Sequence, residues 1–276
     1  MSSRIFAVDA LAGRVVLVTG GGTGLGLASV QELVACGASV VISGRRGEVL
    51  REAAEGVGPA CSYVVGDIRS REDAEAIVDT CLERHGVLHV LVNNAGGQYF
   101  VPAEAIALKG FRAVTRLNVG GTLTMTMAAY ERAFRPAGDG MVVNVTLSPH
   151  HGLAGMTHSS AARAAVEGAT RELAARWADD GVAVCAAAAG HYDTPSLRKY
   201  PEQVWRSAAR TVPLQRLGRM EEHAWLIALL CSPLGHRFSG SVLTLDGGRD
   251  NWFGPWPPPS LAGEGGTVPT EERRHG

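Results

Sequence analysis

Residues 19–26, TGGGTGLG, decide the fold of this chain. They follow the apolar run 14–18, typical of a buried strand, and precede a segment whose apolar residues recur at helical spacing. A strand, a glycine-rich turn and a helix start form a phosphate cradle, because the first turn of a helix offers free N–H groups and the positive end of its dipole. Gly20 permits the tight turn, Gly24 lets the backbone approach a pyrophosphate, and Gly26 lets the helix pack closely on the strand.

Length and composition predict one large α/β domain, over residues 1–253, followed by a Pro- and Gly-rich tail at 254–276. The net charge of −1 argues against nucleic acid or an anionic membrane as a partner, and no apolar run approaches the ~18 residues of a membrane span. The first ten residues lack the apolar core of a signal peptide. Five scattered cysteines are expected to be small buried hydrophobes rather than disulfides or metal ligands.

Strand-like and helical patterns alternate along nearly the whole chain. The candidate strands are 14–19, 39–43, 62–65, 88–92, 141–146, 182–186 and 242–245. The candidate helices are 24–36, 46–55, 71–84, 110–134, 158–179 and 220–231. This alternation predicts a Rossmann-type, doubly wound parallel sheet of about seven strands with helices on both faces.

Four further segments follow in a characteristic order: NNAGG at 93–97, RLNVGGT at 116–122, VVNVT at 142–146 and DGG at 246–248. Together with TGGGTGLG they resemble the short-chain dehydrogenase/reductase family over about residues 13–250. Within that family the chain looks most like the peroxisomal-type trans-2-enoyl-CoA reductases and the 2,4-dienoyl-CoA reductases. The resemblance implies an NADP(H)- or NAD(H)-dependent oxidoreductase.

The resemblance also implies a set of cofactor contacts, although glycine, asparagine and aspartate are equally the usual residues of turns. They fall in the pyrophosphate loop, at the adenine and its ribose, and at the nicotinamide end. The set is Gly20, Thr23, Gly24, Leu25, Gly26, Asp67, Ile68, Asn94, Ala95, Gly96, Arg163, Gly190 and Thr194.

The end of the second strand predicts which nucleotide is preferred. Family members that prefer NAD carry an acidic residue there, which accepts from the ribose 2′-hydroxyl. This chain has Gly44 at that place, followed by Arg45 and Arg46. Guanidinium groups bind a phosphate in a bidentate manner, so we expect NADP(H); the alternative is a solvated arginine pair at a helix start.

The proton-transferring Tyr-x-x-x-Lys pair of the family is absent. Arg163 falls on the lysine position and Ser159 on the tyrosine position, while Thr146 or Leu147 takes the serine position with Ser148 close by. Arginine can bind ribose hydroxyls but cannot relay a proton. We therefore predict weak oxidation of simple alcohols. An enoyl reductase tolerates the loss better, because hydrogen-bond donors can carry an enolate charge.

Other side chains are candidates for the missing acid and for substrate contacts. We expect Asn118, Ser148, His158 and Arg163 to converge at the nicotinamide end as the catalytic set. Substrate contacts are expected at Tyr99, His151 and Tyr192, and no metal site is expected. For each histidine the alternative is a solvated loop residue or a helix cap. Glu167 and Arg171, four residues apart, are expected to form a surface ion pair.

These expectations favour an NADPH-dependent enzyme that reduces the C=C bond of an enoyl thioester or a related enone. Two alternatives stay open: non-redox chemistry such as dehydration, isomerisation or cyclisation by pocket histidines, and a silent NADP(H)-binding sensor. Measuring NADPH oxidation with an enoyl-thioester panel separates the three. We expect a cytoplasmic homo-oligomer, a tetramer or dimer, with a small-molecule substrate and no nucleic-acid or membrane partner.

Overall fold

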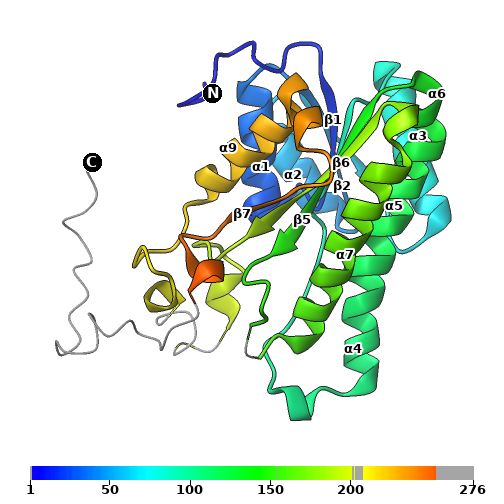
Figure 1. Cartoon of the computed structure of the whole chain (residues 1–276). Helices are drawn as coiled ribbons and strands as arrows, with labels where there is room; N and C mark the ends of the chain where they lie inside the picture. The colour runs from blue at the N-terminus through cyan, green and yellow to red at the C-terminus, as the bar shows by residue number, and fades with distance from the viewer. Residues whose placement is uncertain (1, 154, 201, 203–207, 253–276) are drawn as a thin grey trace.

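The computed structural model describes residues 2–153, 155–200, 202 and 208–252 (Figure 1). The tail expected at 254–276 lies outside the described residues. Within them, seven parallel strands form one sheet in the order β3-β2-β1-β4-β5-β6-β7. The strands are β1 (Val15–Thr19), β2 (Ser39–Gly44), β3 (Cys61–Val65), β4 (Val90–Asn93), β5 (Gly140–Leu147), β6 (Val182–Ala189) and β7 (Val242–Leu245). The predicted doubly wound α/β fold is confirmed.

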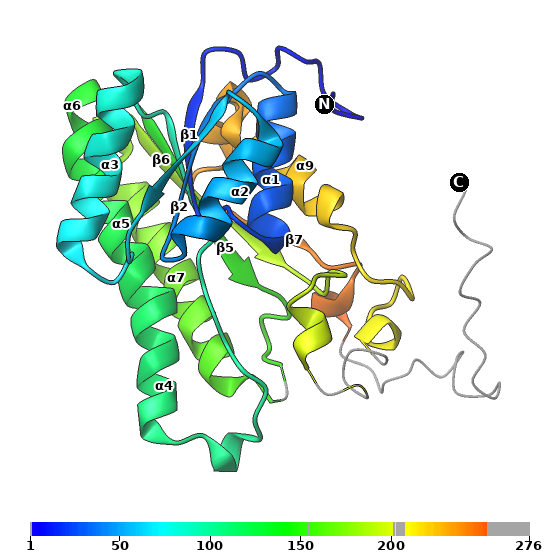
Figure 2. The ribbon, with the colours of Figure 1, turned by 180° about the vertical axis from the view of Figure 1, so that it is seen from behind.

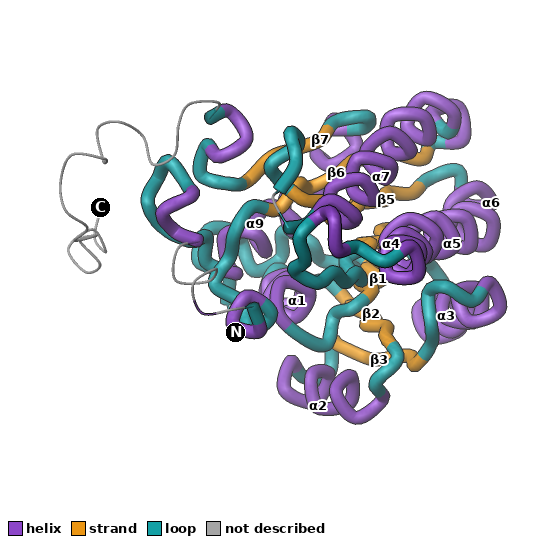
Figure 3. The backbone as a smooth tube through the Cα atoms, turned by 90° about the horizontal axis from the view of Figure 1, so that it is seen from below, coloured by secondary structure: helices purple, strands orange, loops and turns teal. Residues whose placement is uncertain are grey.

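Helices cover both faces of the sheet, with α1, α2 and α9 on one side and α3, α5 and α7 on the other (Figure 3). Figure 2 shows the same two layers from behind. The helices are α1 (Gly24–Ala35), α2 (Gly47–Val57), α3 (Arg71–His85), α4 (Leu108–Thr115), α5 (Thr122–Ala129), α6 (Arg135–Ala137), α7 (Thr157–Arg176) and α9 (Met220–Cys231). None of the described helices is long and apolar enough to cross a membrane.

Local sequence signals explain where helices begin and end. The Ser70 side chain accepts a hydrogen bond from the Asp73 N–H at the start of α3, and Gly86 ends that helix in the left-handed conformation. The helix expected at 110–134 instead runs from α4 to α6 and contains two π-helical turns. The first of these turns holds the buried Asn118, and such turns occur often at functional sites.

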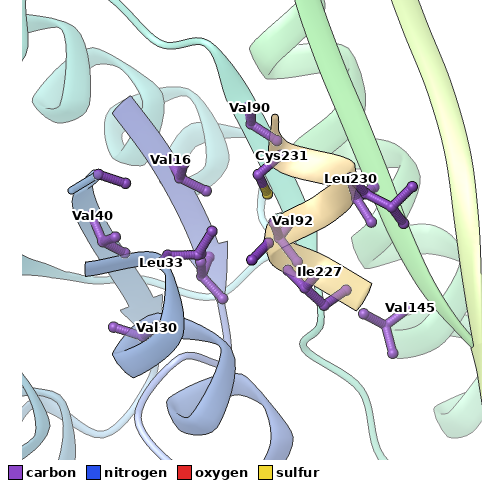
Figure 4. Close-up of a cluster of buried hydrophobic side chains, with 14 of the residues drawn as sticks. Val16, Val30, Leu33, Val40, Val90, Val92, Val145, Ile227, Leu230 and Cys231 are labelled. Carbon is purple, nitrogen blue, oxygen red and sulfur yellow. The ribbon is translucent and has the colours of Figure 1, made fainter. Parts of the chain in front are cut away.

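The core lies on both faces of the sheet, as a parallel sheet requires. Successive residues of β1 alternate between the two faces: Val16 and Val18 pack with Leu33 of α1, whereas Leu17 packs with Ile77 of α3. Figure 4 shows the first cluster, in which side chains of α1 and α9 meet the central strands. All five cysteines are free and buried, which confirms their expected role as small hydrophobes.

Candidate active site

A cleft of about 930 Å³ opens at the carboxyl ends of the strands, where α/β proteins bind their ligands. Residues from the ends of β1, β2, β4, β5 and β6 contribute to its walls. Every residue expected to contact a cofactor lines it, and their contacts with a nucleotide stay a prediction. These residues are Gly20, Thr23, Gly24, Leu25, Gly26, Arg45, Arg46, Asp67, Ile68, Asn94, Ala95, Gly96, Arg163, Gly190 and Thr194.

The glycine-rich turn has the shape that a pyrophosphate needs. Gly20 and Gly24 have φ angles of +67° and +55°, in the left-handed region that glycine adopts without strain. A Cβ atom at Gly26 would overlap the Gly20 carbonyl oxygen. The Asn94 amide nitrogen donates to the carbonyl oxygens of Thr19 (3.0 Å) and Gly20 (3.2 Å), which holds the turn against the end of β4. The residues present therefore fit a dinucleotide at the start of α1.

The end of β2 is positively charged. Arg45 and Arg46 are exposed and line the cleft, and within the described part of the chain neither guanidinium forms an ion pair. Asp67 also lines the cleft, but Arg69 binds both of its carboxylate oxygens. These hydrogen bonds lower the pKa of Asp67 to about 2. Two cations without an ion pair in the described part of the chain therefore follow Gly44, at the place where family members that prefer NAD carry a carboxylate.

Arg163 and Asn118 meet at Gly96. The Arg163 Nη1 atom donates to the Val145 carbonyl oxygen at 2.8 Å, and burial lowers the pKa of this guanidinium to about 10. The Asn118 amide nitrogen donates to the Gly97 carbonyl oxygen at 2.7 Å. A Cβ atom at Gly96 would lie 2.6 Å from Asn118 Oδ1 and would overlap Arg163 Nη2. These two predicted catalytic residues are thus brought together at Gly96, which lines the cleft with Arg163, while the fully buried Asn118 lies behind the lining.

Ser148 and His158 do not join them. The Ser148 hydroxyl is fully buried and donates to the Asp246 carboxylate. The His158 ring is also fully buried and packs edge-on against Tyr99, with ring centroids 4.4 Å apart. His158 precedes Arg163 by five residues, so it projects about 140° round α7 from it. The expected convergence of all four side chains on the cleft is therefore wrong, since Arg163 lines it but Asn118, Ser148 and His158 do not.

The three residues expected to contact the substrate do not all line the cleft. Tyr192 lines the cleft, although its hydroxyl donates to the Leu245 carbonyl oxygen at 2.9 Å. Tyr99 is 39% exposed and covers His158 instead of lining the cleft. His151 lies outside the lining as well, with its Nδ1 atom 3.8 Å from Asp250.

Glu167 does not form the expected surface ion pair with Arg171. Glu167 is only 4% exposed. It follows Arg163 by four positions, so both side chains lie on the inner face of α7, against β5. The Thr146 hydroxyl, which belongs to a cleft-lining residue, donates to Glu167 Oε1 at 2.8 Å. The carboxylate is therefore connected to the cleft wall.

A histidine contacts the same oxygen of this carboxylate. The His150 Nε2 atom lies 3.0 Å from Glu167 Oε1, and its Nδ1 atom lies 2.5 Å from Asp250 Oδ2. Burial lowers the pKa of His150, but the hydrogen bonds and charges of Asp250 and Glu167 outweigh it, so the pKa lies above its ordinary value. A hydrogen-bonded chain thus runs from Thr146 through Glu167 and His150 to Asp250.

Sequence reasoning missed several cleft-lining side chains beyond β6 and β7. Lys199, Tyr200 and Arg249 line the cleft, as does His191. Burial, with the charge of Arg249, lowers the pKa of His191 to about 4. A usable signal existed for Arg249: it directly follows the DGG motif, and the carboxyl end of the last strand lies at the ligand-binding edge.

Comparisons with known proteins agree with this fold and cleft. Residues 20–250 match the family model described as "Enoyl-(Acyl carrier protein) reductase". The chain is 33% identical over 253 residues to a peroxisomal 2,4-dienoyl-CoA reductase of Pongo abelii, covering 89% of this chain and 86% of that protein.

Two solved structures are similar as well. A citronellol catabolism dehydrogenase of Pseudomonas aeruginosa PAO1 superposes with a TM-score of 0.81 at 35% identity, covering 91% of this chain and 100% of the other. A 3-ketoacyl-(acyl-carrier-protein) reductase of Brucella melitensis, complexed with NADH, gives a TM-score of 0.81 at 29% identity, with 87% and 99% coverage.

The fold and the cleft define a nucleotide-binding α/β protein of the Rossmann type. The chain belongs to the short-chain dehydrogenase/reductase family of oxidoreductases, and it is similar to the 2,4-dienoyl-CoA reductases within it.

Proposed function

We propose that this protein uses NADPH to reduce the C=C bond of an enoyl thioester or a related enone. The observation that carries the proposal is a cleft with a nucleotide cradle, together with a buried serine, Ser159, at the position of the family's tyrosine. Relatives named as dienoyl-CoA reductases support the same reaction class, and a similar structure is described as a complex with NADH.

Several side chains would hold the cofactor, which supplies a hydride when bound. The turn of Gly20, Gly24 and Gly26 fits the pyrophosphate, and Arg45 with Arg46 would bind the 2′-phosphate of NADPH. Arg163 replaces the lysine that holds the nicotinamide ribose in the family. Its buried guanidinium has no carboxylate partner in the described part of the chain, which leaves its donors for ribose hydroxyls.

The reaction class follows from the missing phenol. A ketone reductase must protonate an alkoxide at once, and losing a positioned general acid costs about 10²–10⁴-fold. In enone or enoyl-thioester reduction the hydride adds to Cβ, and the electron pair of the C=C bond moves to the carbonyl as an enolate. Hydrogen-bond donors can stabilise this charge until Cα receives a proton. The absence of a tyrosine is therefore less costly for this reaction.

The chain of Thr146, Glu167 and His150 is the proton source that we propose. Thr146 lines the cleft and its hydroxyl donates to Glu167, which in turn contacts the His150 ring. The protonated His150 ring would pass its Nε2 proton to the Glu167 carboxylate, Glu167 would pass it to the Thr146 oxygen, and Thr146 would give its hydroxyl proton to Cα of the enolate. One hydride and one proton thus saturate the double bond.

Purified protein mixed with NADPH and a panel of enoyl thioesters and simple enones tests the proposal through absorbance at 340 nm. We expect substrate-dependent loss of absorbance, and little turnover with NADP⁺ and simple secondary alcohols. Tight NADPH binding without turnover would instead identify a silent cofactor-binding protein. Product formation without any change in the nicotinamide would indicate non-redox chemistry.

We further propose a cytoplasmic homo-oligomer, a tetramer or dimer. Support comes from the family resemblance alone, and relatives named as peroxisomal occupy another compartment. Light scattering on the purified protein gives the number of subunits, and fractionation of the source cells gives the compartment. A monomer, or protein confined to an organelle, would contradict this assembly or location.

A further inference from the structure

The cleft is strongly positive although the whole chain carries a net charge of −1. The charged side chains described in its lining include one carboxylate, Asp67, which Arg69 already binds. Clefts lined by one sign of charge concentrate ligands of the other sign. The cations of the lining are Arg45, Arg46, Arg163, Lys199 and Arg249.

Arg249 lies on the turn Arg249–Asn251 that follows β7. Figures 1 and 2 show this orange turn between the yellow-green and yellow segments that contain Leu197–Lys199 and Ala208–Thr211. Its Nη1 atom donates to the Thr211 carbonyl oxygen at 2.7 Å. Its Nε atom is buried without a hydrogen-bond partner, and burial lowers the pKa of the guanidinium.

The neighbouring carboxylates are already engaged by other groups. Asp246 accepts hydrogen bonds from the Ser148 hydroxyl and from the N–H groups of Gly248 and Asp250. The Asp250 side chain accepts from the His150 N–H and contacts the His150 ring. Arg249 therefore forms no ion pair with any residue that the structure describes. The Asp246 charge favours the Arg249 cation without contacting it, but burial outweighs this effect, so an anionic ligand in direct contact would stabilise the cation.

The cofactor phosphates cannot be that counterion. Neighbouring strands lie about 4.8 Å apart, and β7 is five strands away from β2 in the sheet order, so Arg249 stands about 24 Å along the sheet from Arg45 and Arg46. The pyrophosphate turn follows β1, four strands away from β7. Arg249 thus lies at the end of the cleft opposite Arg45 and Arg46.

The same part of the cleft offers apolar surface. Its lining includes Phe100, Met156, Leu197 and Tyr200, together with the exposed cation of Lys199. Apolar walls fit a hydrocarbon body, and a guanidinium fork fits the two oxygens of a carboxylate. The ligand expected at this end therefore has an apolar body and a terminal negative charge.

We propose that Arg249 is a specificity-determining residue that binds a carboxylate at the end of the substrate, with Lys199 as a second, more solvated cation. The substrate is then an enone or enoyl compound that carries a free carboxylate away from its C=C bond. This assignment of substrate class rests on the proposed function of the cleft.

Steady-state kinetics with a matched substrate pair tests it. An enone that ends in a free carboxylate is compared with its methyl ester, using the full chain and NADPH. We expect the carboxylate to be preferred in kcat/KM by about tenfold to a hundredfold, the range of a charge-assisted hydrogen bond. Arg249→Gln should abolish the preference, because kcat/KM should fall much more for the carboxylate than for the ester. Arg210→Ala is the matched control, because Arg210 lies in the same segment as Thr211, is exposed and does not line the cleft.

A binding measurement keeps this test separate from that of the proposed function. Calorimetry with NADP⁺-loaded protein compares hexanoate with hexanamide, and the wild type should bind hexanoate at least tenfold more tightly whereas Arg249→Gln should not. Equal binding of the two probes, or unchanged hexanoate binding by Arg249→Gln, would overturn the assignment. Tighter binding of inorganic phosphate at Arg249 would overturn the choice of carboxylate. If no enone is reduced but hexanoate binding depends on Arg249, the proposed reaction fails and the anion site stands.

Discussion

The Nε2 atom of His150 lies 3.0 Å from the Oε1 atom of Glu167, a carboxylate that is almost completely buried in α7. This contact ties the loop after β5 to the helix that carries Arg163. The second ring nitrogen contacts Asp250, so the histidine also connects both elements to the segment after β7. A protonated ring satisfies two carboxylates at once.

His150 should make stability depend on pH. Its folded-state pKa is raised, so its contribution is fully present below the unfolded pKa of about 6.5 and is lost as pH rises through the folded pKa. His150→Gln should therefore lower the free energy of unfolding more at pH 6 than at pH 9, measured by urea denaturation. Adding Asp250→Asn to this variant should cost little more, because both changes remove the same contact. An equal loss at both pH values would contradict the prediction.

Arg45 should select NADPH over NADH. Arg45→Ala removes a guanidinium that would bind the 2′-phosphate, so NADPH affinity should fall by about 1.5–3 kcal/mol while NADH affinity hardly changes. Fluorescence titration of both nucleotides measures the difference. Arg71→Ala is the control, since Arg71 is an exposed arginine on α3 outside the cleft lining. Equal affinities of the unmutated protein for the two nucleotides would refute NADPH preference.

Thr146 should contribute to kcat and not to the affinity for NADPH. Thr146→Val keeps the shape of the side chain but removes the hydroxyl between the cleft and Glu167. We expect kcat for enone reduction to fall by about 10²-fold with an unchanged Kd for NADPH. Thr80→Val provides the comparison, because the Thr80 hydroxyl only donates to a carbonyl within α3. Full activity of Thr146→Val would remove this residue from the proton path.

Replacing Gly26 by alanine should lower the stability of the protein, whereas replacing Gly56 by alanine should raise it. A Cβ atom at Gly26 would overlap the Gly20 carbonyl oxygen, so Gly26→Ala should lower stability by about 1–3 kcal/mol and weaken NADPH binding. Gly56 lies in α2 with open space around it, so Gly56→Ala should raise stability by about 0.5–1 kcal/mol. Thermal denaturation with and without NADPH measures both effects. A stabilised Gly26→Ala variant would show that the turn is not tightly packed.

The order of elements and the nucleotide cradle could be predicted from local patterns. A strand–glycine turn–helix unit depends on neighbouring residues, so TGGGTGLG and the alternation of apolar runs predicted the seven-stranded sheet. The same locality explains the observed position of Arg45 and Arg46, which directly follow β2. Element ends were less well predicted, because packing extended β6 to Ala189 and π-helical turns interrupted the helix around Asn118.

The side-chain partners at the far end of the cleft could be decided only by the tertiary structure. Glu167 looked like half of a surface ion pair, yet the rotation of α7 buries it beside Thr146. His158 looked like a candidate acid, but the same rotation packs it under Tyr99. Asp246 and Asp250 come from the last described segment and contact residues 98 and 100 positions earlier. Local sequence cannot specify such contacts, because they depend on how the two faces of a helix and the edges of a sheet are oriented once the core has packed.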